Sequence, residues 1–365
     1  MSNILDYLKW RNDLTFSQDP FNEIDSLILS RFVYIRWEEI LENESCLISE
    51  AYQKFLSMDT STMHMLAKED PTLFELIAKS NRFKDCKISD FVYVFDEENI
   101  VQFCAMCIHL PDKTHYISFR GTDNTLVGWK EDLYMSFQPN IHAHRFALDY
   151  LKTISRKYRG KLRIGGHSKG GNLAIYSSLF APKYIQRKLI QIDNFDGPGL
   201  SKEDNEMKKD LDIYQKIHVY CPQNSIIGRM LYHDESKFSL IYSNAKGPLQ
   251  HDLYTWEVIN KQFSYVEAFE KSSEIVENSI NEFLNLVTPE QRKQCIDVIF
   301  EILESTNENT FHEFKSNWFK NSTQVVKYVS KIKPDERKVV MDAAKMFMSI
   351  MFDEYKSTIV QKEGN

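Results

Sequence analysis

The sequence has few of the residues that make long flexible linkers. Of its 365 residues only 12 are glycine and 10 are proline. A chain with so little of either residue has no Gly-rich or Pro-rich linker of any length, and we find no internal repeat. We therefore expect compact folded regions joined by short connections, with enough chain for one large α/β domain with additions or for two domains.

The sequence also lacks signs of export, of a membrane span and of nucleic-acid binding. Residues 1–6 contain no basic region followed by an apolar run, which predicts the absence of a signal peptide. No apolar stretch approaches the length that crosses a bilayer. The net charge is −7, with Lys and Arg mixed among the acids, so there is no basic stripe for nucleic acid. Reduced thiols and no export signal together predict a cytoplasmic protein.

Cysteine is sparse, with six scattered residues. Cys104 and Cys107 form a Cys-x-x-Cys pair, a spacing that can indicate redox chemistry or a metal site. They lie inside the strand-like run 100–109, however, and residues three apart on a strand point to opposite faces. No second pair follows, so we interpret both as buried strand cysteines and expect no metal.

What is present divides into three stretches. Residues 1–85 predict a helical N-terminal extension packed on the core, in which Asn22 and Asp25 cap a helix. Residues 86–255 predict the core domain. Residues 256–365 predict a helical region to the end of the chain, with helix starts at Thr288-Pro289 and at Pro334.

The core stretch alternates between strand and helix patterns. Strands alternating with helices indicate an α/β fold with a mainly parallel sheet and helices on both faces. The predicted strands are 91–95, 100–109, 114–119, 162–165, 189–195, 217–221 and 238–243, and the predicted helices between them are 143–158, 171–180 and 202–211.

The run Gly166-His167-Ser168-Lys169-Gly170-Gly171 lies between a predicted strand and a predicted helix. It contains Gly-x-Ser-x-Gly, which in this setting is typical of a nucleophile elbow, a sharp turn that holds a serine at the top of an α/β-hydrolase sheet. The helix that begins there aims N–H groups and the positive end of its dipole at the reacting centre. Ser168 is therefore the candidate nucleophile, and the backbone N–H of Lys169 is a candidate oxyanion donor. The alternative is a glycine-rich turn that holds phosphate.

Several segments carry a family resemblance. Residues 164–174 resemble the elbow of the class 3 (fungal-type) lipases, and 118–122 resemble their Phe-Arg-Gly-Thr/Ser segment. Over nearly its full length the chain more closely resembles the lipase-like bacterial family DUF2974 (Mbeg1-like), through residues 3–7, 14–16, 194–199 and 250–252. The resemblance implies an α/β-hydrolase fold and a second oxyanion donor at Thr122.

The general base should follow the last strands, in the chain order of an α/β hydrolase. His251 lies beyond the last predicted strand, and the resemblance agrees with this position. The main rival is His233. His142 and His218 fit structural roles better, and His167 should point away from Ser168 if the turn is normal.

The third member of a catalytic triad is the acid that orients the histidine. In class 3 lipases it stands just after the strand that here ends near Cys221, but this chain has Asn224-Ser225 at that place. Three alternatives stay open. Asp196 could supply the carboxylate from the preceding strand end, Asp234 or Glu235 could do so from the next loop, or Asn224 or Ser225 could orient the histidine without charge. We favour Asp196, which could instead only hold the Gly-Pro-Gly turn that follows it.

Two functions from different classes follow. One is a serine hydrolase that cleaves a carboxylic or lipid ester through an acyl-enzyme on Ser168, with no metal or organic cofactor. A peptidase or thioesterase would use the same triad. The other is a catalytically weak or inactive binding or scaffold protein on a hydrolase fold. The expected partners are an ester substrate, a peripheral membrane contact and a protein bound through the helical C-terminal region, but not nucleic acid.

Overall fold

The structure is a computed structural model. It describes residues 1–41, 45–59, 63, 65–123, 125–135, 138, 140–208, 211–304, 332–334, 337–343, 345–346 and 348–350. The chain divides into two compact units. The first contains residues 1–95, 103–121 and 142–269, and the second contains residues 96–102, 122–141 and those from 270 onwards.

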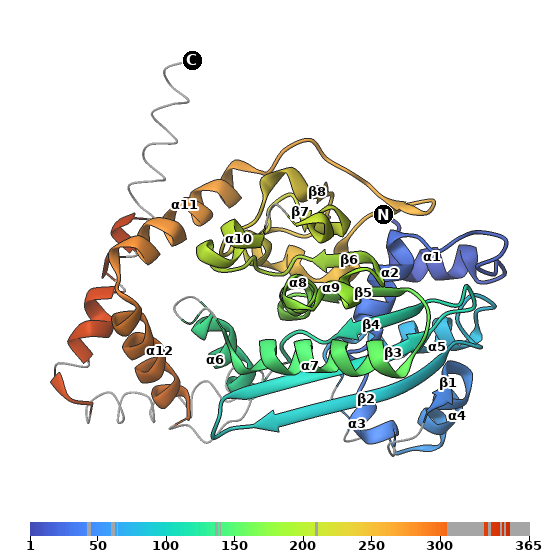
Figure 1. Cartoon of the computed structure of the whole chain (residues 1–365). Coiled ribbons are helices and arrows are strands. Elements are labelled where there is room, and N and C mark those ends of the chain that lie inside the picture. Colours follow the sequence, from blue (N-terminus) through green and yellow to red (C-terminus); the bar gives the residue numbers. More distant parts are fainter. Residues whose placement is uncertain are drawn as a thin grey trace. The chain divides into compact units, whose positions relative to one another are not determined.

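An eight-stranded sheet has its strands in the order in which they occur along the chain (Figure 1). β3 and β4 are antiparallel, and β4 through β8 run parallel to one another. This confirms the predicted α/β-hydrolase-type, mainly parallel sheet. The strands are β1 (Cys46–Leu47), β2 (Lys87–Asp96), β3 (Val101–His109), β4 (His115–Phe119), β5 (Leu162–His167), β6 (Leu189–Phe195), β7 (Ile217–Pro222) and β8 (Phe238–Ile241).

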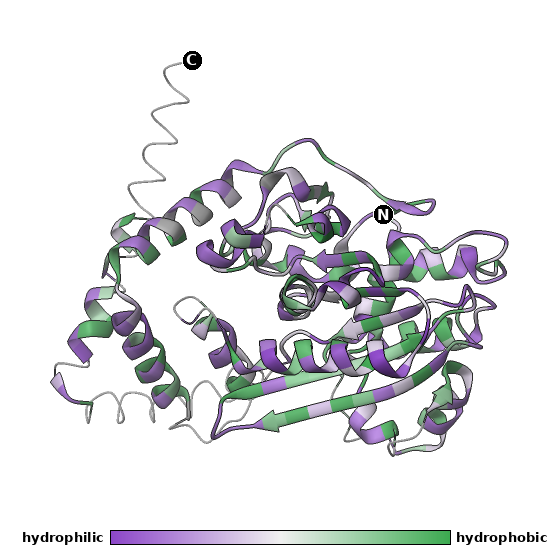
Figure 2. Ribbon diagram, in the orientation of Figure 1, coloured by the Kyte–Doolittle hydropathy of each residue, from purple (hydrophilic) through white to green (hydrophobic). Residues whose placement is uncertain are grey.

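Helices cover both faces of the central strands. Neighbouring residues of a strand point to opposite faces, and β5 shows this with two adjacent glycines. A Cβ on Gly165 would meet the hydroxyl of Ser30 on α2 (Glu23–Phe32), whereas one on Gly166 would meet Gly170 on α8 (Lys169–Phe180). Helix α7 (His142–Lys157) packs beside α8. Figure 2 shows hydrophilic and hydrophobic residues on different sides of α7, as expected for a helix with one buried face.

The remaining helices of this first unit are short. They are α1 (Ile4–Arg11), α3 (Trp37–Ile40), α4 (Ile48–Ser57), α5 (Asp70–Lys79), α9 (Lys183–Gln186) and α10 (Lys202–Lys208), with 3₁₀ turns η1 (Asp212–Lys216), η2 (Ile227–Arg229), η3 (Glu235–Lys237), η4 (Gly247–His251) and η5 (Leu253–Thr255).

The predicted cap of α2 is confirmed. The Asn22 side chain accepts hydrogen bonds from the N–H groups of Ile24 and Asp25, and the Asp25 carboxylate accepts one from the Asn22 N–H. This reciprocal capping box satisfies N–H groups that the first turn leaves unpaired. Helix α2 therefore begins at a defined residue and lies against β4 and β5.

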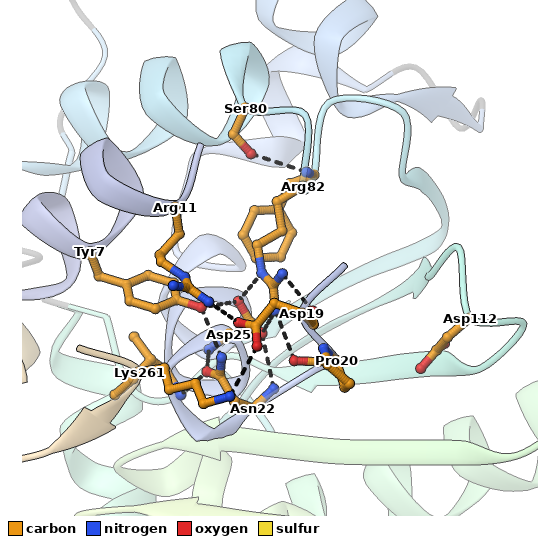
Figure 3. A network of polar contacts seen from close by, with 12 residues as sticks. Tyr7, Arg11, Asp19, Pro20, Asn22, Asp25, Ser80, Arg82, Asp112 and Lys261 are labelled. Carbon is orange, nitrogen blue, oxygen red and sulfur yellow. Dashed lines mark hydrogen bonds and ion pairs between the residues drawn. The ribbon is translucent and has the colours of Figure 1, made fainter. Parts of the chain in front are cut away.

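A buried ion-pair network joins the N-terminal helices to later parts of the same unit (Figure 3). The Arg82 guanidinium binds the Asp25 carboxylate through two nitrogens and the carbonyl oxygens of Asp19 and Pro20. Lys261 reaches the carboxylate of Asp19 from much later in the chain, at 3.0 Å. Residues 1–85 are thus built into the first unit.

Several predicted boundaries change in the structure. Strand β2 begins at Lys87 rather than 91, and α8 begins at Lys169 rather than 171. Helix α10 is described over Lys202–Lys208, and residues 209–210 near its predicted end lie outside the described residues. The prediction of helix throughout from 256 is wrong at its start, because β9 (Val258–Ile259) and β10 (Gln262–Phe263) form a small antiparallel pair before the next helix.

The second unit contains α6 (Leu126–Tyr134), α11 (Lys271–Leu286) and α12 (Pro289–Glu304). The predicted start of α12 is confirmed, because Thr288 and Gln291 exchange side chain-to-backbone hydrogen bonds. The predicted helix start at Pro334-Asp335-Glu336 falls partly on residues 335–336, which lie outside the described residues. Among the described residues, no helix combines the length and apolar character that crossing a bilayer requires.

Candidate active site

Ser168 stands at a strand-to-helix turn in the first unit. Strand β5 ends at His167, α8 begins at Lys169, and Ser168 between them has φ 58° and ψ −133°. A positive φ is uncommon for a residue with a side chain, and such strain is concentrated at functional sites. This backbone is the one that the elbow motif predicts.

The glycines around Ser168 allow the backbone segments to approach closely. A Cβ on Gly170 would lie 2.2 Å from the Phe119 carbonyl oxygen, and one on Gly166 would lie 2.3 Å from the Gly170 carbonyl carbon. A Cβ on Gly197 would lie 2.2 Å from the Ser168 carbonyl oxygen. A side chain at any of these positions would force the elbow apart.

His251 is held next to this elbow by the 3₁₀ turn η4. The imidazole Nδ1 lies 2.7 Å from Oδ2 of Asp196. A carboxylate only accepts, so the Nδ1–H donates and a neutral ring keeps its lone pair on Nε2. The His251 side chain is 28% exposed. In this tautomer Nε2 is the nitrogen that can accept a proton, as a general base must.

Asp196 is the acid that the structure brings to His251. It follows β6 with φ 52° and is 1% exposed. Its second carboxylate oxygen accepts from the Ser225 hydroxyl, and Ser225 Oγ in turn accepts from the Gly228 N–H at 3.0 Å. Charge-assisted bonds of this kind stabilise a buried carboxylate. Ser225 thus donates a hydrogen bond to Asp196, which directly follows the neighbouring strand β6. Ser225 stands at the position that the resemblance to class 3 lipases assigns to an acid.

The residues considered as alternatives to Asp196 have other partners, and the turn after Asp196 is held by a different residue. Asn194, not Asp196, holds the following turn, since its side chain accepts from the Gly197 N–H and donates to the Gly197 carbonyl. The Asp234 carboxylate accepts from Ser236. The Asn224 N–H donates to the Gln250 side chain. The Glu235 side chain lies outside the described parts of the structure.

His167 and Tyr34 contact the candidate site in ways that the sequence did not indicate, although His167 was expected within the elbow. The rings of His167 and His251 are 4.3 Å apart, and His167 Nε2 lies 2.8 Å from the His251 carbonyl oxygen. Burial, with His251 and Arg31 nearby, keeps the pKa of His167 well below its usual value. A neutral His167 therefore donates its Nε2–H to the segment that carries the base.

Tyr34 continues this link into the N-terminal helices. Its hydroxyl donates to the His167 carbonyl oxygen at 3.1 Å and accepts from the Gly121 N–H at 2.9 Å. Gly121 in turn lies against Ser168, since a Cβ on it would be 3.1 Å from Ser168 Cβ. No sequence signal marks Tyr34, because it lies 133 residues before His167.

Two predicted features of the site, the Ser168–His251 hydrogen bond and the pair of oxyanion donors, are not shown by these contacts. Among the hydrogen bonds of the described residues, none joins Ser168 Oγ to His251. Such bonds are often long before substrate binds. Lys169 is the first residue of α8, as an oxyanion donor requires. Thr122 belongs to the second unit, where its hydroxyl donates to Asp132, so its oxyanion role stays a prediction.

The remaining histidines have other environments. His142 begins α7, and His218 lies on β7 with its residue exposed. Burial lowers the pKa of His233 to about 4. His233 Nε2 is buried without a hydrogen-bond partner among the described residues. The carboxylate of Asp196 is bonded to His251 instead, so His251 is the better candidate for the base.

Comparison with known proteins identifies the family of this chain and a solved structure that is similar to part of it. A comparison with curated proteins found no match. The crystal structure of M37 lipase is similar to part of this chain, with 15% identity and a TM-score of 0.37 over 56% of this chain and 68% of that one. The Mbeg1-like family model matches residues 77–301, which include the elbow, Asp196 and His251. The chain belongs to the Mbeg1-like family.

Proposed function

We propose that this protein is a serine hydrolase that cleaves a carboxylic or lipid ester through an acyl-enzyme on Ser168. The observation that carries the proposal is the Asp196–His251 hydrogen bond. It is formed next to the elbow, because the His251 ring lies 4.3 Å from that of His167, and Ser168 follows His167 with elbow backbone angles. A buried carboxylate that fixes the tautomer of a histidine is the second half of a catalytic triad.

In the first half of the reaction His251 Nε2 takes the proton of the Ser168 hydroxyl as Oγ attacks the ester carbonyl carbon. Negative charge then develops on the carbonyl oxygen, and the Lys169 N–H at the start of α8 would stabilise it together with the Thr122 N–H. Asp196 stabilises the imidazolium. Collapse of the intermediate breaks the bond to the alcohol, which leaves with the proton from Nε2.

In the second half water repeats the sequence. His251 takes a proton from the water, whose oxygen attacks the acyl carbon, and the ester bond to Ser168 Oγ breaks. The proton returns to Oγ and the carboxylic acid departs. Apart from the ester and the water, every group in this scheme belongs to a residue of the chain.

The experiment combines covalent labelling with turnover. A fluorophosphonate should modify Ser168 of the wild-type protein, and Ser168→Ala should lose both the label and the cleavage of p-nitrophenyl esters of graded acyl length. Ser177→Ala is the matched control, because Ser177 is buried further along α8 and among the described residues its hydroxyl bonds only the Ala174 carbonyl. A folded wild-type protein that is neither labelled at Ser168 nor active on any ester would instead support a binding role.

A further inference from the structure

A cluster of metal-ligand side chains lies far from the nucleophile in the first unit. Cys107 and His109 are two residues apart on β3, and His115 is the first residue of β4, directly paired with His109. Cys107 Sγ and one ring nitrogen of each histidine all lie within 4.8 Å of one another. Thiolate and imidazole are the ligands that zinc prefers.

The hydrogen bonds of His115 determine which of its nitrogens carries a proton. His115 Nε2 lies 2.7 Å from the Arg159 carbonyl oxygen. A carbonyl only accepts, so Nε2 carries the hydrogen and the neutral ring keeps its lone pair on Nδ1.

The same reasoning applies to His109 through a longer chain of bonds. The Ser89 hydroxyl donates to the Asp90 carboxylate at 2.7 Å, and Asp90 also accepts from Tyr158 and pairs with Lys157. A hydroxyl has one hydrogen, so Ser89 Oγ offers a lone pair to His109 Nε2, 2.7 Å away. His109 Nε2 must then be the donor, which leaves the lone pair of a neutral His109 on Nδ1.

The two Nδ1 atoms lie 2.8 Å apart. Two neutral rings would therefore point lone pairs at each other, a repulsion that either a shared proton or a metal cation between the two Nδ1 atoms would remove. Cys107 Sγ, which lies within 4.8 Å of both ligand nitrogens, favours the metal cation. The partners on the two Nε2 atoms, a backbone carbonyl and a serine–carboxylate pair, are those that orient histidines in metal sites. The nitrogens would separate by about half an ångström to take a tetrahedral zinc ion.

We propose that Cys107, His109 and His115 bind a zinc ion, with water in the fourth position. Zinc displaces the thiol proton of Cys107 to solvent, since the thiolate is the ligand. Cys104 takes no part, because it belongs to the core cluster on the opposite face of β3.

The position of this cluster separates it from catalysis. His115 pairs with Leu162 at the beginning of β5, whereas Ser168 follows the end of β5. The zinc ion would hold β3 and β4 together and, through Arg159 and Tyr158, join them to the segment after α7. We expect it to stabilise the fold without entering ester hydrolysis.

The test uses the full-length protein, freed of metal with a chelator and then titrated with Zn²⁺ or Co²⁺. Wild type should bind one zinc ion per chain and melt at a higher temperature with zinc. Its cobalt form should show a thiolate-to-cobalt charge-transfer band and the strong visible bands of four-coordinate cobalt. Cys107→Ser and His115→Asn should lose these signals, and Ser89→Ala should weaken binding by about 10- to 100-fold.

Cys104→Ser is the matched control, because it removes a buried thiol of the same strand and should bind zinc like wild type. Circular dichroism of each variant establishes that it folds, and His115→Asn, at a partly exposed position, gives a second reading if Cys107→Ser does not. A folded wild-type protein that takes up no zinc, or a Cys107→Ser protein that keeps wild-type affinity and the charge-transfer band, would overturn the proposal.

Discussion

Asp196 shows how much one residue's environment decides at this site. The carboxylate is buried, with one oxygen on His251 and the other on the Ser225 hydroxyl. An amide at this position could present its N–H₂ to His251 and stabilise the wrong tautomer. The role of Asp196 thus depends on its charge as well as its place.

We expect Asp196→Asn to lower kcat for an ester substrate by about 10⁴-fold. Ser225→Ala, which removes one donor from the same carboxylate, should lower it by about tenfold. Steady-state kinetics on p-nitrophenyl esters measure both. Asp252→Asn is the control, because Asp252 follows His251 but only caps η5, a role that Asn fills as well. Equal losses in the Asp196 and Asp252 variants would contradict this assignment.

The strand-to-helix element β5–α8 depends on a close approach between backbones. Gly170 lies in the first turn of α8, and a Cβ there would lie 2.2 Å from the Phe119 carbonyl on β4. Backbone atoms cannot move aside as the end of a flexible side chain can. The packing of α8 on the sheet therefore has room for glycine alone at this position.

Gly170→Ala should strongly lower the free energy of unfolding and abolish fluorophosphonate labelling of Ser168. Gly247→Ala gives the comparison: its φ is +54° but nothing lies within 4 Å of the added Cβ, so the expected loss is about 1–2 kcal/mol of conformational strain. Urea unfolding of the two variants measures the difference. A Gly170→Ala protein as stable as Gly247→Ala would show that the elbow can widen.

The contact between α2 and β6 contains a buried acid, Asp193. One oxygen accepts from Ser26 on α2 and from Gln191, and the other has no hydrogen-bond partner among the described residues. Burial raises the pKa of Asp193 to about 7. Folding therefore takes up a proton at this position at pH values between the unfolded pKa, about 4, and 7.

The stability that the protonated Asp193 contributes to the folded state is fully present below about pH 4 and is lost as the pH rises through 7. The stability lost is about 1.4 kcal/mol per pH unit within that window. Asp193→Asn cannot ionise, so the difference in unfolding free energy between wild type and variant should change in the variant's favour as the pH rises. Urea unfolding at several pH values from 4 to 8 measures it. Buried histidines with lowered pKa values give the opposite slope in both proteins and cancel.

At the scale of the whole molecule, the N-terminal helices form part of the first unit. Asp25 and Arg82 form an ion pair with each other, and their side chains are 0% and 1% exposed. Ser26 on α2 bonds the Tyr116 hydroxyl on β4 and the Asp193 carboxylate on β6. Unfolding of residues 1–85 should therefore accompany unfolding of the sheet.

Arg82→Met should lower the free energy of unfolding by about 3–5 kcal/mol, because it leaves the Asp25 carboxylate buried without a counter-charge. The double variant with Asp25→Asn should recover part of this loss. Lys79→Ala, which breaks the exposed pair with Glu75, should have no measurable effect. A single transition, seen alike by tryptophan fluorescence and circular dichroism, would show one cooperative unit. An Arg82→Met protein as stable as Lys79→Ala would contradict the prediction.

Local sequence determined the elements and the elbow. The Asn22 and Thr288 caps, the parallel strand pattern and the Gly-x-Ser-x-Gly turn act over a few residues, so their signals are contiguous in the chain. The sequence misplaced the end of an element where pairing with a distant segment extends it. Strand β2, for example, begins at Lys87 because its first residues pair with β1.

Only the tertiary structure decided which distant groups meet. Asp196 was one of several acids within reach of His251 by sequence, and 55 residues separate the two. Tyr34, His167 and the Cys107–His109–His115 cluster likewise depend on contacts across strands and between chain-distant segments. Sequence spacing specifies side-chain direction within one element, but the partners that determine charge, tautomer and ligation come from elsewhere in the fold.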